Sequence, residues 1–577
     1  MNLRKTDEDS FQGRIFFLAV AVLLSIGLIV VRLFFVQVIS HDYYSALAQS
    51  QQELSSELIP ERGEVYIRDK FSQEPYPLVR NVNRPLVFAV PQQISDAPAL
   101  AKKLSAILGL DSKEVLSKIT NQEKKYVPLA KQVEEDRAEE LKKLKLPGIY
   151  FEDQIRQDYP EGTLAAQVLG FVAFDEHRRV GRYGLEYFFE KDLAGKPGFI
   201  SGAKDPTGVW ITGGEREVQP AEDGVDLILT LDRAIQFKAE EVLEKSVVAH
   251  GAKSGSVVVL DPKTGAILAM ANYPSFDPNH FNEVPDPGLY NNTSVQAAYE
   301  PGSVLKPITF AGSLDAGAIT PDMTFDDPGS VTLERFTIRN AENKTYGAGV
   351  SMTRVLEESI NTGAIFAEQQ MGHDKFLEYL EKFGFGKFTE VTLPFEAPGD
   401  ISNLDRGGDL YPATAAFGQG ITVTQLQLAQ AYAAIANGGR LFQPFVIAEK
   451  VRKISQAEKT APRMLREVVS AHTASTLSAM LVSVVEKGHG KRAAVPGYFI
   501  AGKTGTAQIA AEGRLGYDVS RSVGTFAGFG PIDDPRFVMV VKIDEPQGVR
   551  FAESTAAPAF GEIAQFILNY YQVPKSR

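Results

Sequence analysis

The sequence contains no cysteine among its 577 residues, so neither disulfide bonds nor thiolate metal ligands take part in its fold or chemistry. This absence does not indicate a compartment, because many proteins outside the cytoplasm also lack disulfides. The seven histidines are scattered, and no His-Glu-x-x-His pair occurs, which disfavours a catalytic metal. We therefore expect no metal and no cofactor.

The sequence also lacks a long run of basic residues. Its 60 Lys and Arg residues against 72 Asp and Glu residues give a net charge of −12 at pH 7. A nucleic-acid-binding protein needs a basic surface to neutralise phosphates, so we expect no nucleic-acid partner. The apolar content of 44% is that of a folded protein, and the length is typical of about two to four domains.

One long apolar run lies near the N-terminus. Residues 15–31 carry no charge, and after Arg32 the run resumes through Val36, which is long enough to span a bilayer. A buried helix is disfavoured because the run is apolar on all faces. A cleaved signal peptide is disfavoured because the run is too long and the Ala-Leu-Ala at residues 46–48 lies far beyond it. We predict an uncleaved transmembrane anchor at residues 15–36.

The charges beside the anchor predict its orientation. Arg4, Lys5 and Arg14 precede it, and no Lys or Arg follows it before Arg62. Positive residues stay on the cytoplasmic side. We therefore predict a single-pass protein of the cell (inner) membrane, with residues 1–14 as a cytoplasmic tail and the large C-terminal part outside the cytoplasm.

The remaining chain divides into three predicted parts. Residues 37–58 are polar and helix-prone, as in a stalk. Residues 59–224 mix short strands with a charged helix at 133–146 and contain no catalytic motif, which favours a scaffold or docking role. Residues 225–577 begin with strand, helix and hairpin and end with hairpin and helix. This order predicts an α/β (α+β) domain with an antiparallel sheet covered by helices.

The stretch GYFIAGKTGTAQ, residues 497–508, fits two different motifs. Read from Gly497 it matches a phosphate-binding loop, and read from Lys503 it is the Lys-Thr-Gly-Thr of enzymes that acylate a serine. A phosphate-binding loop needs a flexible glycine-rich turn before a helix. Here the turn would contain Tyr-Phe-Ile-Ala, and strand-like spacing follows Lys503, so the second interpretation is favoured.

A Ser-x-x-Lys motif occurs twice, starting at Ser201 and at Ser303. Ser201 lies in a loop flanked by Gly and Pro, and a second Lys-Thr-Gly at Lys263 lies in a predicted hairpin turn, so both are expected to be surface features. A helix starting near Ser303 would place Lys306 one turn further, with its amine within reach of the serine hydroxyl. Pro307 is compatible with this helix because it falls in the first turn.

A third motif, Ser-Ile-Asn, lies between the other two. Ser359 and Asn361 follow a predicted helix and could point into one cleft if the helix ends there. Alone, the pair would be an ordinary helix end, and its position between the other motifs is what gives it significance.

The three motifs, in this order and at this spacing, resemble those of class B penicillin-binding proteins. The resemblance extends through EPGSVLKP, GAILAMANYPSFDPN, the membrane anchor and the boxes ERGEVYIRD, DYPEGTLAAQVLGF and GRYGLEYFFEKDLAGKPG of the N-terminal domain. Two positions depart from the family pattern: Ile67 replaces an aspartate, and Arg156 is one place further from Tyr159 than usual. The sequence looks most similar to the septal, division-specific branch.

This resemblance implies a peptidoglycan D,D-transpeptidase with a β-lactamase-like C-terminal domain behind a pedestal or dimerisation-type domain. Ser303 would attack the D-Ala-D-Ala carbonyl of a stem peptide, release D-alanine and pass the acyl group to a neighbouring stem. Lys306 would be the base, which requires a neutral amine, and Lys503 would be the cation that lowers its pKa. β-Lactams would acylate the same serine.

The resemblance also implies roles for the other motif residues. Ser359 would relay a proton, and Asn361 would bind the substrate amide. Thr504, Gly505 and Thr506 would bind the substrate, with Thr504 and Thr506 holding its carboxylate. The backbone N–H groups of Ser303 and Thr506 would form the oxyanion hole.

Missing motifs bear on the implied partners and on the competing functions. The region before residue 225 has no Glu-Asp-x-x-Phe-x-x-His box, so glycan polymerisation would come from a membrane-embedded glycosyltransferase of the SEDS type, with other division proteins as partners. No Glu-x-x-x-Asn follows Asn361, which weakens a β-lactamase or D,D-carboxypeptidase interpretation. The sequence is also compatible with an elongation-type transpeptidase and with a catalytically idle division scaffold.

Overall fold

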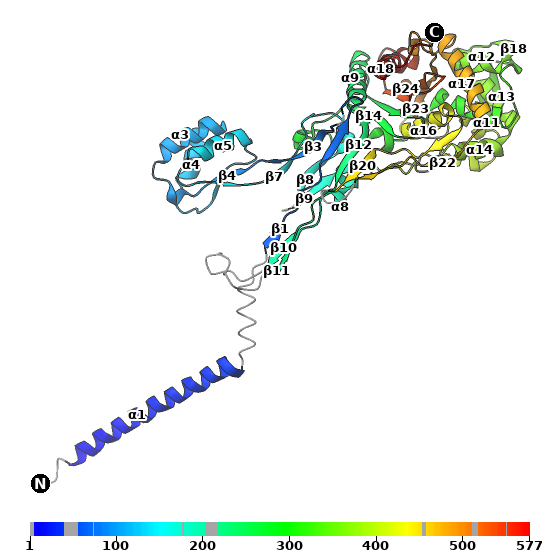
Figure 1. The fold of residues 1–577 in the computed structure, drawn as a ribbon. Helices are drawn as coiled ribbons and strands as arrows, with labels where there is room; N and C mark the ends of the chain where they lie inside the picture. The colour runs from blue at the N-terminus through cyan, green and yellow to red at the C-terminus, as the bar shows by residue number, and fades with distance from the viewer. Residues whose placement is uncertain are drawn as a thin grey trace. The chain divides into compact units, whose positions relative to one another are not determined.

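The computed structural model describes most of the chain, in eight segments. These are residues 5–39, 56–72, 74–175, 178–201, 217–452, 457–510, 517–549 and 551–576. They form two compact units, one drawn from residues 1–61 and 195–223 and the other from residues 62–194 and 224–577 (Figure 1). Most of the predicted stalk lies outside the described residues.

The first unit contains one long helix and a small sheet. Helix α1 (Lys5–Phe34) continues into a π-helical turn, η1 (Phe35–Ile39). An antiparallel sheet follows with the order β1-β10-β11, formed by Ser56–Leu58, Gly198–Ser201 and Glu217–Gln219. Within the residues that the structure describes, no helix combines the length and the apolar character needed to cross a membrane. The transmembrane anchor therefore stays a prediction.

The second unit contains a six-stranded sheet that joins the two predicted domains. Its order is β21 (Glu458–Lys459), β20 (Ile447–Val451), β12 (Asp226–Asp232), β2 (Val65–Arg68), β3 (Tyr76–Asn83) and β7 (Ile155–Asp158). The strand predicted just after residue 225 is β12. It pairs in parallel with β2, with Leu227 opposite Val65, and antiparallel with β20. The predicted boundary at residues 224 and 225 is therefore followed at once by a shared strand.

The N-terminal part of this unit also holds a separate small core. A sheet in the order β5-β4-β6 packs with three helices around buried side chains such as Val87, Leu104 and Leu141. The bounds are β4 (Leu86–Ala89), β5 (Val127–Ala130), β6 (Ile149–Glu152), α3 (Ala97–Leu108), α4 (Ser112–Ile119) and α5 (Glu135–Lys143). The short strands and the charged helix predicted for this part of the chain are confirmed, the helix as α5.

A hairpin and three short helices complete the N-terminal part. They are β8 (Phe171–Asp175), β9 (Arg178–Arg182), α6 (Ala166–Leu169), α7 (Gly184–Phe188) and α8 (Glu190–Leu193). Both departures from the family pattern have a structural place. Ile67 is fully buried within β2, where an apolar side chain suits the core, and the Arg156 guanidinium lies 4.2 Å from the centre of the Phe174 ring.

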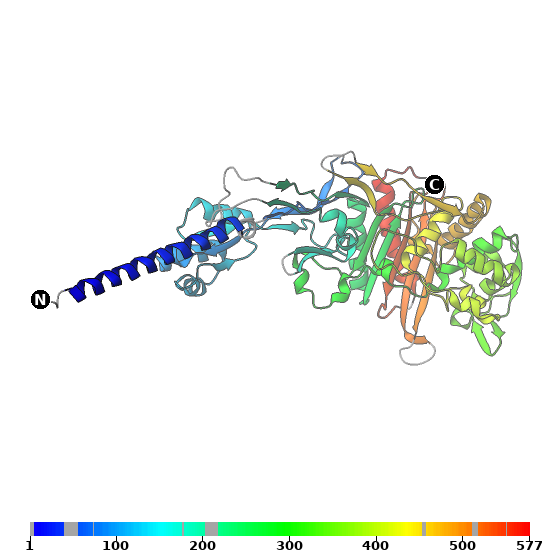
Figure 2. The same ribbon diagram turned by 90° about the horizontal axis from the view of Figure 1, so that it is seen from below.

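The C-terminal part is built on a five-stranded antiparallel sheet, as predicted (Figure 2). Its order is β14 (Ile267–Tyr273), β13 (Ser254–Leu260), β25 (Phe537–Asp544), β24 (Tyr517–Gly530) and β23 (Ala501–Ala510). The predicted hairpin between β13 and β14 is present: Asp261 N donates to Ala266 O at 2.8 Å, and Gly265 takes a φ of 82° that favours glycine.

Helices cover both faces of this sheet. On one face lie α9 (Arg233–Ala249) and α18 (Ala556–Tyr570), and Phe560, Ile563 and Ile567 of α18 are buried there. Asp232 caps α9 by accepting from Ala234 N and Ile235 N. On the other face α16 (Gln425–Ala436) packs on the central strands. Burial on both faces explains the nearly continuous apolar character of β25.

Further helices and short strands lie between β14 and β23 in the chain. They are α10 (Thr293–Gln296), α11 (Lys306–Asp315), β15 (Thr324–Asp327), β16 (Ser330–Leu333), β17 (Phe336–Arg339), β18 (Gly347–Ser351), α12 (Met352–Glu357), α13 (Asn361–Met371), α14 (His373–Lys382), α15 (Leu410–Ala415), β19 (Arg440–Phe442), β22 (Met464–Glu467) and α17 (Ala471–Glu486). Three antiparallel pairs, β15–β18, β16–β17 and β19–β22, lie within this region.

Candidate active site

Ser303 and Lys306 lie where a tight turn becomes a helix. Ser303 belongs to the 3-10 turn η5 (Gly302–Leu305), and α11 begins at Lys306. Pro307 occupies the first turn of α11, where a missing N–H leaves no intrahelical bond unmade. The predicted helix therefore exists, but its regular α-helical part starts at Lys306 and not near Ser303.

Glycines allow the turn that holds Ser303 to lie directly against β23. A Cβ atom on Gly505 would come within 2.9 Å of Pro301 O and of Val304 N. Gly302 has a φ of +60°, and its N–H donates to Gly418 O at 3.0 Å. The glycine of the Lys-Thr-Gly motif is thus needed for close approach, which brings the serine turn beside the strand that carries Lys503.

The Lys306 amine is fully buried and bonds to the Ser-x-Asn motif. Its Nζ lies 2.5 Å from Ser359 O, 3.2 Å from Ser359 Oγ and 2.9 Å from Asn361 Oδ1. These three contacts between described residues all end on the Ser359–Asn361 segment, so the expected contact between Lys306 and the Ser303 hydroxyl stays a prediction.

The Lys503 amine approaches the same serine from β23. Its Nζ donates to Ser359 Oγ at 3.0 Å and to Thr504 O at 3.0 Å. Ser359 Oγ is therefore within hydrogen-bonding distance of both lysines. The predicted helix does end here, since α12 stops at Glu357 and Ser359 has a φ of 57°, a strained value for a residue with a Cβ.

The two buried amines have lowered pKa values. Burial, together with the charge of Lys503, holds the pKa of Lys306 well below its ordinary value. Burial lowers the pKa of Lys503 to about 7. A low-dielectric site disfavours two neighbouring ammonium groups, and Lys306 bears both unfavourable effects. Lys306 is therefore the amine that is neutral first, as a general base must be.

A cleft of about 530 Å³ opens onto these groups. Ser303, Ser359, Asn361, Thr504 and Thr506 line it, whereas the two lysines lie fully buried behind its wall. Its lining also includes residues that no sequence motif marked: Arg339, Phe417, Gln419, His489, Phe551 and Glu553. They come from segments far apart in the chain, so only the fold brings them together. Seven of the eight predicted site residues have thus been placed at or just behind one cleft, and Gly505 lies on β23 between Thr504 and Thr506.

The duplicate motifs lie away from the cleft. Lys263, in the turn between β13 and β14, pairs with Asp534 as a surface charge. Ser201 ends β10, and the lysine three residues after it lies outside the described residues. Among the residues that the structure describes, no cluster of three or more His, Asp or Glu side chains could hold a metal ion.

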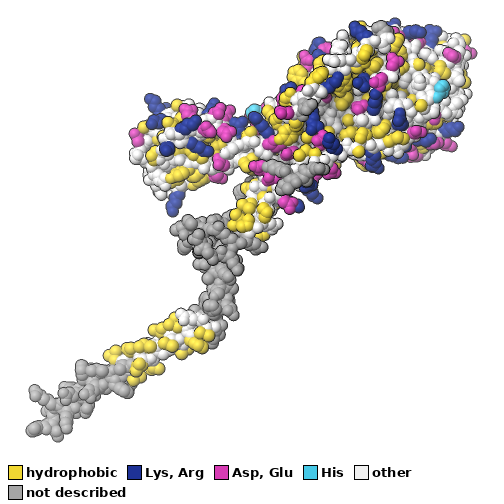
Figure 3. All heavy atoms as spheres, in the orientation of Figure 1, with side chains coloured by type: hydrophobic (Ala, Val, Ile, Leu, Met, Phe, Trp, Pro, Cys, Tyr) yellow, Lys and Arg dark blue, Asp and Glu magenta, His cyan; other side chains and the backbone are white. Residues whose placement is uncertain are grey.

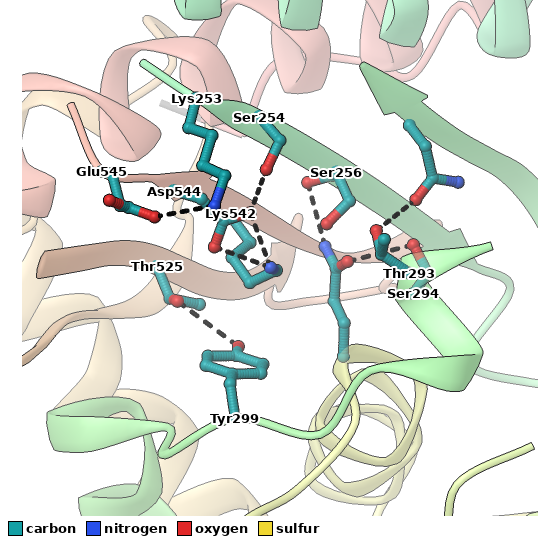
Figure 4. Close-up of polar contacts among 12 residues, drawn as sticks. Lys253, Ser254, Ser256, Thr293, Ser294, Tyr299, Thr525, Lys542, Asp544 and Glu545 are labelled. Atoms are coloured by element: carbon teal, nitrogen blue, oxygen red, sulfur yellow. Dashed lines mark hydrogen bonds and ion pairs between the residues drawn. The ribbon is translucent and has the colours of Figure 1, made fainter. Parts of the chain in front are cut away.

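A buried polar cluster supports the segment that leads into Ser303 (Figure 4). The Thr525 hydroxyl donates to Tyr299 Oη at 3.3 Å, and the Lys542 ammonium lies 5.1 Å from the Tyr299 ring centre. Lys542 also donates to both carboxylate oxygens of Asp544 at 2.8 Å. Thr525 faces Gly505 across the β23–β24 ladder. The cluster thus connects the strand of the Lys-Thr-Gly motif with the chain four residues before Ser303.

Comparison with known proteins identifies the family. Residues 255–565 match the penicillin-binding protein transpeptidase domain, and residues 57–229 match the penicillin-binding protein dimerisation domain. Stage V sporulation protein D of Bacillus subtilis is 33% identical over 540 residues, which are 92% of this chain and 82% of that protein. Peptidoglycan D,D-transpeptidase FtsI of Escherichia coli is 31% identical over 560 residues, which are 95% and 90% of the two chains.

A solved structure supports the same assignment. Penicillin-binding protein 3 of Mycobacterium tuberculosis, complexed with aztreonam, superposes with a TM-score of 0.70 and 28% identity over 90% of this chain and 98% of that one. A dimerisation domain thus precedes an antiparallel-sheet transpeptidase domain. The chain belongs to the class B penicillin-binding proteins, the family indicated by its three motifs.

Proposed function

We propose that this protein is a septal peptidoglycan D,D-transpeptidase, which cross-links stem peptides through an acyl-Ser303 intermediate. One observation carries the proposal: Lys306 Nζ and Lys503 Nζ both contact Ser359 Oγ behind a cleft that Ser303 lines. A relative named as a peptidoglycan D,D-transpeptidase agrees with a role in cell-wall synthesis, and the septal part of the proposal rests on the resemblance of the sequence to the division-specific branch.

Acylation would begin with transfer of the Ser303 hydroxyl proton to neutral Lys306. Ser303 Oγ bonds to the carbonyl carbon of the penultimate D-alanine, and the backbone N–H groups of Ser303 and Thr506 stabilise the oxyanion. The carbon–nitrogen bond then breaks, and Ser359 relays the proton from Lys306 to the leaving amine. D-Alanine departs and the acyl-serine ester remains.

Transfer to the acceptor would run the same steps in reverse. The amine of a second stem peptide attacks the ester carbon and gives its proton to Lys306, and the Ser303 oxygen leaves with a proton from the same relay. Asn361 would bind the substrate amide, while Thr504 and Thr506, held on β23 by Gly505, would bind the terminal carboxylate. Lys503 would supply the positive charge that keeps Lys306 neutral.

The membrane arrangement is part of this proposal. Residues 15–36 would form the single transmembrane anchor, with residues 1–14 in the cytoplasm and the catalytic domain outside it. The described apolar side chains of α1 support this, since Leu18, Leu23 and Leu28 are 66%, 68% and 72% exposed and need an apolar environment (Figure 3). A stalk, the pedestal at residues 59–224 and the transpeptidase domain at residues 225–577 would follow.

We further propose the partners that this role requires. Glycan strands would be polymerised by a membrane-embedded glycosyltransferase of the SEDS type, acting with other division proteins. β-Lactams would acylate Ser303, a proposal supported by the aztreonam complex of the Mycobacterium tuberculosis relative. An elongation role is the second candidate, but the resemblance of the sequence to the septal branch favours division.

The experiment that tests the proposal is labelling of the purified protein with a fluorescent penicillin. The native protein should form a stable adduct, Ser303→Ala should form none, and Ser201→Ala is the matched control because it removes the serine of the duplicate Ser-x-x-Lys motif. Equal labelling of native protein and Ser303→Ala would show that Ser303 is not the nucleophile. No adduct on the native protein would favour the idle scaffold, and rapid loss of the adduct would favour a hydrolase.

A further inference from the structure

The turn at Ser359 is strained, and its own segment does not cap the helix that follows. Ser359 has a φ of 57°, and Ile360, the residue before α13, offers no capping side chain. The first N–H groups of a helix need acceptors from outside the helix. Here Asn340 Oδ1 accepts from Asn361 N at 3.0 Å and from Thr362 N at 3.1 Å. The helix is thus capped by a residue 21 positions upstream.

Asn340 is itself held by a buried carboxylate. Its Nδ2 lies 3.0 Å from each carboxylate oxygen of Asp327, and both residues are only 4% exposed. Asp327 also accepts from Gly329 N at 3.0 Å, from Tyr346 N at 2.7 Å and from Thr362 Oγ1 at 2.5 Å. Burial raises the pKa of Asp327, but the bonds from Thr362, Tyr346 and Gly329 outweigh it and leave the pKa below its ordinary value. The carboxylate therefore stays ionised at neutral pH.

The neighbouring backbone orients the side chain of Asn361. At the end of β17, Arg339 O accepts from Asn361 Nδ2 at 3.0 Å. With its amide nitrogen bound there, Asn361 turns Oδ1 toward Lys306 Nζ, at 2.9 Å. The corner at residues 339 and 340 therefore fixes the backbone of the Ser-x-Asn motif and also the direction of its amide.

We propose that Asp327 and Asn340 form a positioning clamp that sets the orientation of Ser359 and Asn361 for acyl transfer. The clamp deepens the proposed function and rests on it for its effect on rate. Neither residue touches Ser303 or belongs to a sequence motif. They act through Asn361 N–H and Thr362 N–H, which determine where the strained Ser359 presents its hydroxyl to the two lysines. Loss of the clamp would move Ser359, while the Ser359 hydroxyl and the two lysines that contact it would all remain present.

The first test compares Asn340→Ala and Asp327→Asn with native protein. The observed rate constant for acylation by a fluorescent penicillin should fall about 10- to 100-fold, because small misplacements of catalytic groups have effects of this size. Asp326→Asn is the matched control, because Asp326 is the exposed neighbour and its carboxylate accepts from Gly349 N at 2.9 Å. It should acylate at the native rate, within about twofold.

A second variant separates positioning from mere support of the fold. Asn340→Asp keeps a capping oxygen but places a second carboxylate against Asp327, and two carboxylates at this distance resist ionising together. Its acylation rate, relative to native protein, should therefore fall as the pH rises from about 5 to 8. The nearby titratable phenol of Tyr346 stays neutral in this range because burial, then Glu358, raises its pKa; Lys344 and Glu342 also lie near that phenol. The double variant Asp327→Asn with Asn340→Asp has one carboxylate again, so its acylation rate relative to native protein should not change with pH over this range.

A third measurement tests the clamp without relying on acylation by penicillin. Amide hydrogen exchange of the peptide that contains Asn361 and Thr362 should be faster in Asn340→Ala than in native protein. Unchanged exchange would overturn the clamp. If native protein is labelled normally and the folded clamp variants are labelled equally fast at every pH, the clamp has no effect on catalysis. If Ser303→Ala labels as well as native protein, the proposed function fails instead, and the exchange result still decides the clamp.

Discussion

Two buried lysines share one serine hydroxyl in this protein, and their surroundings lower the pKa of each amine. Lys306 starts a helix and contacts the carbonyl of Ser359 and the amide of Asn361, whereas Lys503 extends from a strand. Both amines are removed from water, but the pKa of Lys306 is also lowered by the charge of its neighbour. A base and a cation can therefore coexist within one hydrogen-bonded group.

This pair predicts a bell-shaped pH dependence of acylation. Below the pKa of Lys306 the base is protonated, so the rate falls as the pH is lowered. Above about 7 Lys503 loses its proton, so the rate falls again as the pH rises. The measurement is the acylation rate constant of the native protein from pH 5 to 9. A rate that rises steadily to pH 9 would contradict a cationic role for Lys503.

The strained backbone of Ser359 predicts a difference between two substitutions that both remove its hydroxyl. Ser359→Gly should be more stable than Ser359→Ala by about 1 kcal/mol, because glycine adopts a φ of 57° without strain. Both variants should acylate slowly. Denaturant unfolding of the two proteins measures the difference, and equal stability, or a more stable Ser359→Ala, would show that this position carries no strain.

At the scale of elements, the site depends on how β23, η5 and α13 meet. Thr525 lies on β24, which pairs with β23, and Lys542 lies on the next strand, β25. Both side chains reach Tyr299, so the sheet supports the turn that holds Ser303. The ion pair of buried Lys542 with half-buried Asp544 is the charged centre of that support, with side chains 7% and 18% exposed.

Removing the Lys542 side chain should be destabilising because it leaves a partly buried carboxylate without its partner. Lys542→Met leaves Asp544 without its cation and should lower the free energy of unfolding by about 3 kcal/mol at pH 7. Adding Asp544→Asn should recover most of this loss, and a double-mutant cycle from denaturant unfolding measures this coupling. Purely additive losses would show that the pair is not coupled.

The sequence is informative about individual helices, strands and turns, and less informative about contacts between residues far apart in the chain. The hairpin at Asp261, the cap at Asp232 and the helix end at Ser359 follow local patterns that one segment contains. The capping of α13 by Asn340 and the placing of Asp327 depend on contacts between distant residues and leave no periodic or motif signal. For the same reason the motifs predict the Lys306 position but not that its amine bonds to Ser359.

At the scale of the whole molecule, the pedestal and catalytic parts share a sheet. β12 lies between β2, which precedes residue 224, and β20, which follows it. The buried guanidinium of Arg62, just before β2, contacts the carboxylates of Glu186 at 2.5 Å and Glu190 at 2.6 Å. Removing one partner of a buried ion pair leaves an unpaired buried charge and is strongly destabilising. The start of β2 is therefore fixed to the α7–α8 region of the N-terminal part.

This shared sheet predicts that the transpeptidase part does not fold well alone. A fragment of residues 225–577 would leave the β2 side of β12 as an open edge with buried apolar residues such as Leu227 and Leu229 newly exposed. We expect it to aggregate or to melt well below a fragment of residues 62–577, which keeps β2 and serves as the matched control. Thermal unfolding, solubility and penicillin labelling of the two fragments measure the difference. If residues 225–577 matched the longer fragment in all three, β12 would need no partner from the pedestal, and the catalytic domain would be energetically independent.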